Sequence, residues 1–164
     1  MRTTPKLYYG VFVLPNLHDY ETDPTIARAY NAAATASYLA DVTLEFYKKN
    51  DPTSQIAQFG SIGEFVEHLT KREKYFRIIR SVATVYRHLY NTDSKYDLPS
   101  PGPERIVVPA IDGELVKPDG VLDIIFRRPS DGTEFSLNVA LKAVIEKMWP
   151  DVLPPEDKVP NWLS

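Results

Sequence analysis

The pattern of apolar and polar positions divides the chain into a helical part followed by a part made of short strands. Residues 24–49 are rich in alanine and carry apolar side chains on more than one side, which predicts a largely buried helix. Asp23 followed by Pro24 is typical of a helix start, and Asp51 before Pro52 is typical of an end. We therefore expect a central helix over residues 24–49.

Two further amphipathic helices are expected after this one. Ser61 and Glu64, and again Thr70 and Glu73, have the spacing of a capping box, in which each side chain satisfies a backbone amide near the helix start. Apolar residues at helical spacing follow each pair. The pattern predicts a short helix, a break and a longer helix, so that residues 24–91 form an antiparallel helical bundle.

The periodicity changes after the proline-rich residues 91–103. Short β-branched or aromatic runs follow, separated by Asp-Gly pairs at 112–113, 119–120 and 131–132, and such pairs are a strong hairpin signal. Ser136 can cap a last amphipathic helix that ends at Trp149, before Pro150. The expected fold class is α+β: a helical bundle with a small antiparallel β-meander and a C-terminal amphipathic helix.

The two ends of the chain are expected to differ from this core. The apolar run over residues 7–17 is too short for a membrane span and contains Gly10 and Pro15, so we interpret residues 1–23 as a strand or packed arm. Residues 151–164 are expected to form an extended tail whose Trp162 docks on its own domain or, alternatively, anchors a partner. The expected organisation is one domain over 1–164: arm 1–23, bundle 24–91, meander plus helix 104–150, and tail 151–164.

Composition narrows the classes of function. The chain is 43% hydrophobic, 25% charged and 12% aromatic, which is typical of a globular protein. A net charge of −3 gives no general attraction to nucleic acid, so RNA binding would need a local basic patch. The chain has no cysteine, and its three histidines are far apart in sequence. We expect no metal, no cofactor, no membrane segment and a cytoplasmic location.

One helix face carries the candidate chemistry. Arg77, Ser81, Thr84 and His88 lie on one face at helical spacing, with Arg80 at its margin. A histidine beside arginines can act as a general base on a ribose 2′-hydroxyl while a guanidinium binds the phosphate. Arginines are also common on solvated helix faces, and a cation near a helix C-terminus is favoured by the helix dipole. Both interpretations stay open, and we favour the solvated face.

Acidic residues offer weaker candidates. Asp41 lies in an otherwise apolar helix, so its carboxylate needs a partner, and we expect a salt bridge to Arg80 or Arg77. The acidic run at residues 16–23 contains one histidine and has no second ligand cluster at a defined spacing. We interpret it as a loop ending in a helix cap.

The order of these segments resembles a known group. "YNAAATASYLAD", then "FRIIRSVATVYRHLY", then a hairpin and an amphipathic helix ending in tryptophan is similar to uncharacterised bacterial proteins with HEPN-like helical bundles, over residues 24–150. Nuclease members of the wider HEPN group carry an arginine, four to six further residues and then a histidine, and two such motifs face each other across a dimer. Here seven residues separate Arg80 from His88, and Arg87 directly precedes His88, so neither arginine has that spacing. The resemblance implies the helical architecture and pairing with another copy or protein more than it implies catalysis.

Two hypotheses of function follow. The first is a non-enzymatic intracellular protein-interaction module that binds a protein partner or a second copy. The alternative is a HEPN-like metal-independent ribonuclease or RNA-binding protein, with His88 as base or proton donor and an arginine on the phosphate. The candidate catalytic residues are His88, Arg80 and Arg87, and the candidate binding residues are Arg77, Ser81, Thr84, Asp41 and Trp162.

Overall fold

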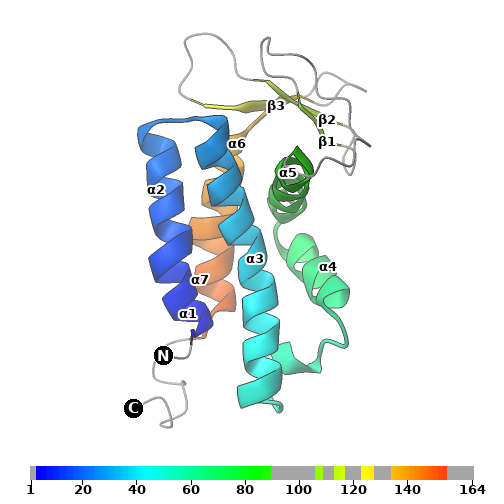
Figure 1. Ribbon diagram of the computed structural model, residues 1–164. Helices are drawn as coiled ribbons and strands as arrows, with labels where there is room; N and C mark the ends of the chain where they lie inside the picture. Colours follow the sequence, from blue (N-terminus) through cyan, green and yellow to red (C-terminus); the bar gives the residue numbers. More distant parts are fainter. Residues whose placement is uncertain (1–2, 90–105, 109–112, 117–122, 128–133, 155–164) are drawn as a thin grey trace.

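The computed structural model describes residues 3–89, 106–108, 113–116, 123–127 and 134–154. Helices pack side by side in a bundle, and a small sheet lies across one end of it (Figure 1). None of the helices in these ranges is long and apolar enough to cross a membrane.

The N-terminal segment is helical, so the expected strand or packed arm over residues 1–23 is wrong. α1 (Pro5–Tyr8), the π-helical η1 (Tyr9–Val13) and α2 (Leu14–Thr22) follow one another directly, and the Thr4 hydroxyl caps the start by accepting from the Leu7 amide at 3.1 Å. In an α-helix, a proline ring clashes with the carbonyl four residues earlier. The wider π-turn directly before Pro15 gives that ring room, which is why the proline does not end the helix.

α3 (Ile26–Asn50) is the central helix, and it packs against α2, α4, α5 and α6. Its predicted cap, Asp23, is wrong: Thr25 caps the helix by accepting from the Arg28 amide at 3.2 Å, while Asp23 pairs with the Arg28 guanidinium at 2.7 Å. The predicted end is confirmed to within one residue, since Asp51 follows the last helical residue. The buried side of α3 is rich in small residues, which lets neighbouring helices approach closely: Ala29, Ala32, Ala33, Ala36 and Ala40.

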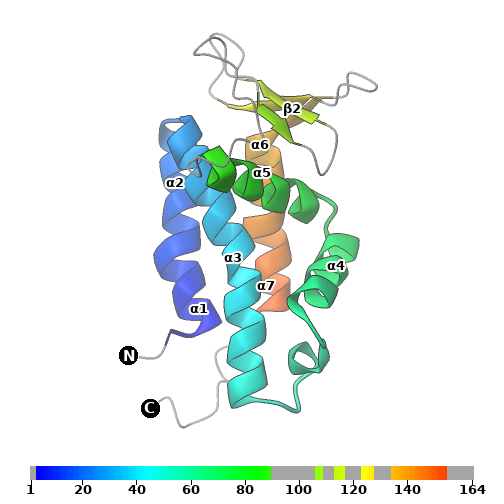
Figure 2. The ribbon, with the colours of Figure 1, turned by 45° about the vertical axis from the view of Figure 1, so that its right-hand side comes forward.

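The short 3₁₀ turn η2 (Ile56–Gln58) leads into α4 (Ile62–Arg72) and α5 (Tyr75–Leu89). α4 lies to one side of α3, and α5 crosses the upper part of α3 (Figure 2). The predicted cap at Ser61 is confirmed, because its hydroxyl accepts from the Glu64 amide at 3.2 Å. The Glu64 carboxylate reaches the Gly60 amide at 2.8 Å and so completes the cap one residue earlier than in the standard box.

The second predicted capping box, at Thr70 and Glu73, is wrong. Thr70 lies inside α4, where its hydroxyl donates to the Val66 carbonyl at 2.9 Å. Glu73 follows the end of α4, and its carboxylate accepts from the Tyr75 amide at 3.1 Å. The break between α4 and α5 therefore lies after Arg72 rather than before Thr70.

The described strands are β1 (Ile106–Val108), β2 (Gly113–Val116), β3 (Ile125–Arg127) and β4 (Glu134–Ser136). They pair antiparallel in the order β1-β2-β3-β4. The expected linker at 91–103 and the three Asp-Gly turns fall largely or wholly outside the described residues.

α6 (Leu137–Lys142), the π-helical η4 (Ala143–Met148) and α7 (Trp149–Val152) form the last helical segment. The predicted cap at Ser136 is confirmed by its bond from the Val139 amide at 3.1 Å. The predicted end at Trp149 is wrong, because the helix continues through Pro150 to Val152. As at Pro15, a π-helical turn precedes the proline.

Two side chains fasten this last segment to the rest of the molecule. Trp149 is fully buried, its indole nitrogen donates to the Ala36 carbonyl at 3.0 Å, and its ring meets Phe76 edge-on with centroids 5.9 Å apart. Asp123, just before β3, accepts from the Tyr20 hydroxyl at 2.6 Å and from the Asn138 amide at 3.1 Å. The sheet, α2 and α6 are thus joined at one carboxylate.

Candidate functional site

A groove of about 520 Å³ runs between α4 and α5. Residues 63–70 of α4 supply four lining residues on one wall, and Arg77, Arg80, Ser81 and Thr84 line the other. The structure therefore brings together four of the residues that the sequence placed on or beside one helix face.

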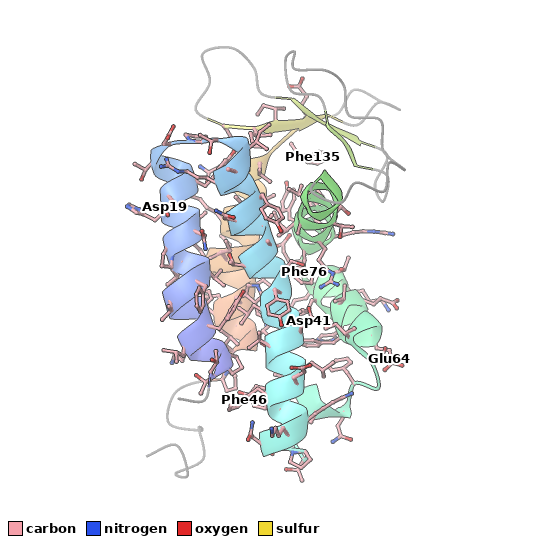
Figure 3. The ribbon with its side chains drawn as sticks, in the orientation of Figure 1. Asp19, Asp41, Phe46, Glu64, Phe76 and Phe135 are labelled. Atoms are coloured by element: carbon pink, nitrogen blue, oxygen red, sulfur yellow. The ribbon has the colours of Figure 1, made fainter. Side chains whose placement is uncertain are left out.

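Most polar groups of this groove already have partners. The Arg80 guanidinium lies 3.8 Å from the Asp41 carboxylate, which confirms the expected salt bridge, although both side chains are about one-third exposed (32% and 37%). Asp41 lies on the side of α3 that faces α4 and α5 (Figure 3). Ser81 is buried, and the Thr84 hydroxyl donates to the Arg80 carbonyl at 2.8 Å. Arg77 is the exposed cation of the groove.

The side chains of the remaining predicted site residues are not among those that the structure describes. Arg87 and His88 belong to α5, but their side chains lie outside the described residues, as does Trp162. Within the described ranges, no group of three or more histidine, aspartate or glutamate side chains could hold a metal ion. The described side chains thus assemble a groove lined by both acidic and basic groups.

A second hollow, of about 480 Å³, lies between the N-terminal helical segment and α3. We call it the aromatic groove, and its walls are the side chains of Tyr8, Phe12, Tyr38, Val42 and Phe46. Figure 3 shows Phe46 on the lower part of α3, on the side toward α1. Glu45 and Lys49 add one carboxylate and one ammonium group to the lining.

The rings of the aromatic groove are close together and open to solvent. The ring centroids of Tyr8 lie 5.0 Å from Phe12 and 6.0 Å from Tyr38, while Phe12 is 46% and Tyr38 55% exposed. Burial raises the pKa of the Tyr8 phenol, and the nearby charge of Tyr38 raises it further. Val11 and Leu14 on the same helical segment are exposed as well. Apolar side chains gathered in this way on a surface mark an interaction site more often than single exposed ones.

The sequence prediction missed the aromatic groove because it took the first segment for a strand. Val13, Leu17 and Tyr20 are buried at spacings of four and three residues, which is helical spacing. Tyr8 and Phe12, four residues apart, then share a different face from these core positions. This spacing could have predicted a helix, but Gly10 and Pro15 favoured a non-helical interpretation.

Comparisons with protein-family models, with curated proteins and with solved structures found no match to this chain.

Proposed function

We propose that the protein is a non-enzymatic protein-interaction module, and that the aromatic groove binds a segment of a protein carrying a large aromatic side chain. The observation that supports this is the exposure of Phe12 and Tyr38 around one hollow lined by further rings. Burying a fully exposed side chain of this size is worth about 1.5–3 kcal/mol. Phe12 and Tyr38 are 46% and 55% exposed, so covering each of them would gain about half of that.

The polar groups of the aromatic groove restrict its occupant further. Lys49 can pair with a carboxylate on the bound segment, and Glu45 can accept from a backbone or indole N–H. Tryptophan suits the apolar lining and Glu45 best, because it combines the largest flat apolar surface with one N–H donor, and neighbouring acidic residues would pair with Lys49. We therefore propose a tryptophan beside acidic residues as the preferred ligand.

A small probe tests this proposal directly. N-acetyl-tryptophanamide is titrated into the full chain and into its Trp162→Ala variant, so that the chain's own tryptophan does not compete, and amide NMR shifts are followed. We expect saturable shifts around Tyr8, Phe12 and Tyr38, and several-fold weaker binding in Phe12→Ala and Tyr38→Ala. Val139→Ala, which removes an apolar side chain that is 54% exposed on α6, is the matched control. Absence of binding to both the full chain and Trp162→Ala would overturn the proposal.

We propose RNA binding on a HEPN-like bundle as the second candidate, because Arg77 and Arg80 line one groove. In this proposal Arg77 contacts phosphate, and His88 acts on the 2′-hydroxyl. Binding and cleavage of a single-stranded RNA are measured for the full chain, Arg77→Ala and His88→Ala. Lys147→Ala is the control for loss of an exposed cation, because Lys147 lies on η4 and does not line the groove. Weaker binding in Arg77→Ala alone supports RNA binding, and cleavage lost only in His88→Ala supports the nuclease. Unchanged values in both variants would exclude this candidate.

A further inference from the structure

The aromatic groove lies close to the point where the described chain ends. Pro154, the last described residue, lines the same hollow as Tyr47 and Asp51, at the C-terminal end of α3. Phe46 and Asn50, which line the aromatic groove, are their immediate neighbours in the sequence. Only the width of one helix therefore separates the chain end from the groove.

The rest of the chain is long enough to cross that width. Trp162 follows Pro154 by eight residues (162 − 154 = 8), and an extended chain of that length spans about 26–29 Å. Half the circumference of a helix 10–12 Å wide is about 16–19 Å. Trp162 can therefore reach the aromatic groove without any change in the described structure.

The segment over residues 155–164 also contains the residue types proposed as ligands of the aromatic groove, a tryptophan and nearby acidic residues. Trp162 and Leu163 are its largest apolar side chains, and Glu156 and Asp157 supply carboxylates for Lys49. Pro155 and Pro160 limit the conformations of the free segment, so less entropy is lost when it docks. A short connection to the groove holds the tryptophan at an effective concentration in the millimolar range.

We propose that Trp162 occupies the aromatic groove of its own chain, so that an outside segment binds only by displacing it. This inference rests on the proposed function in one respect, namely that the same groove binds both ligands. The protein then has a masked binding site, and the competition between the two segments sets the apparent affinity for a partner.

Tryptophan fluorescence tests this occupancy, because the chain has two tryptophans and Trp149 is fully buried. Quenching by acrylamide therefore reports chiefly on Trp162, and Trp162→Ala gives the baseline from Trp149 alone. We expect the wild-type chain to be quenched little more than this baseline. Phe12→Ala and Tyr38→Ala should release Trp162 and at least double the quenching slope, while Val139→Ala should not. Circular dichroism checks that every variant is folded.

Two results would overturn the proposal. The first is a wild-type slope as steep as those of Phe12→Ala and Tyr38→Ala, which means that Trp162 is in water. The second is protection that disappears on dilution, which means that the occupant is Trp162 of a second copy.

The probe titration separates this inference from the proposed function. If Trp162 occupies the groove, N-acetyl-tryptophanamide binds the wild-type chain several-fold more weakly than Trp162→Ala. Equal binding to both overturns the masking and leaves the interaction module standing. Binding to neither overturns the proposed function itself.

Discussion

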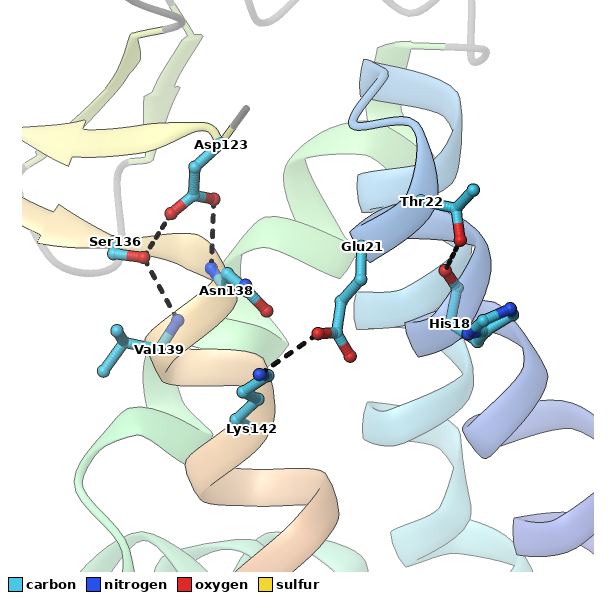
Figure 4. Close-up of polar contacts among 8 residues, drawn as sticks. All are labelled: His18, Glu21, Thr22, Asp123, Ser136, Asn138, Val139 and Lys142. Carbon is cyan, nitrogen blue, oxygen red and sulfur yellow. Dashed lines mark hydrogen bonds and ion pairs between the residues drawn. The ribbon is translucent and has the colours of Figure 1, made fainter. Parts of the chain in front are cut away.

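Replacing Asp123 by alanine is the sharpest test of how the sheet is attached to the helices. Its Oδ1 accepts from the Tyr20 hydroxyl (2.6 Å), the Ile124 amide (2.8 Å) and the Asn138 amide (3.1 Å), and its Oδ2 accepts from the Ser136 hydroxyl. Figure 4 shows the carboxylate above the first turn of α6, where Ser136 in turn caps the helix. Aspartate at this position thus orients donors from α2, β4 and α6 together.

The cost can be worked out contact by contact. The Ile124 amide keeps a second acceptor, the Tyr20 oxygen at 2.9 Å, whereas the Tyr20 hydroxyl, the Ser136 hydroxyl and the Asn138 amide each lose their bond to the carboxylate. A donor left unsatisfied costs about 1–3 kcal/mol, so the three lost bonds set an upper range of about 3–9 kcal/mol. Asp123 is half-buried, so water can reach part of the site, and we expect about 3 kcal/mol. That is a large share of a typical unfolding free energy of about 5–15 kcal/mol.

The assay is urea unfolding followed by circular dichroism, with Asp19→Ala as control because Asp19 is exposed on α2. We expect the control to stay within about 0.5 kcal/mol of the wild type. Asp123→Asn keeps an acceptor oxygen and should lose only about 1 kcal/mol. If Asp123→Ala costs no more than the control, or if asparagine is as harmful as alanine, the carboxylate does not fasten the sheet in the way argued.

Three further predictions concern single contacts. Trp149→Phe should lower the unfolding free energy by about 1–2 kcal/mol in urea melts, because the bond to the Ala36 carbonyl is lost; an unchanged midpoint would contradict this. The Tyr8 pKa, followed by NMR of the labelled ring carbon, should lie above 10.0 and fall in Tyr38→Phe while staying raised by burial. Because the folded state favours the neutral phenol, this contribution to stability is complete below the unfolded pKa and is lost as pH rises through the folded pKa. Ser61→Ala should cost about 1 kcal/mol and Ser61→Asp much less, since either oxygen can cap α4; equal losses would exclude the cap.

The sequence predicted a helix start correctly where a capping residue marks it. Ser61 and Ser136 are caps in the structure because a hydroxyl beside a helix start satisfies an amide whatever surrounds it. Prediction failed where the surrounding structure accommodated a residue that, by itself, indicates a helix end. Pro15 and Pro150 look like helix breakers, but both are accommodated after a π-helical turn. No residue pattern in this chain predicts such a π-helical turn.

The sequence predicted candidate residues only for the groove between α4 and α5, where charged side chains are grouped. The cost of leaving a carboxylate alone on an apolar helix predicted a salt bridge from Asp41 to Arg80 or Arg77, and the structure shows Arg80 as the partner. The aromatic groove could not be predicted in the same way, because whether Phe12 and Tyr38 are covered depends on how two helices, distant in sequence, are placed. Exposed and buried aromatic residues look alike until the packing is known.

Both grooves depend on α3, and this decides which variants can test them. Tyr38, Val42 and Phe46 repeat every four residues along one side of the helix, while Asp41 faces α5 on another side. The buried stripe containing Ala36 and Ala40 sets the distance from α3 to its neighbours, so a larger residue there would move the walls of both grooves together. Variants at Phe12, Tyr38 and Arg77 change one surface at a time, because these side chains are exposed and do not belong to the buried core. Loss of binding in these variants can therefore be assigned to the groove rather than to the fold.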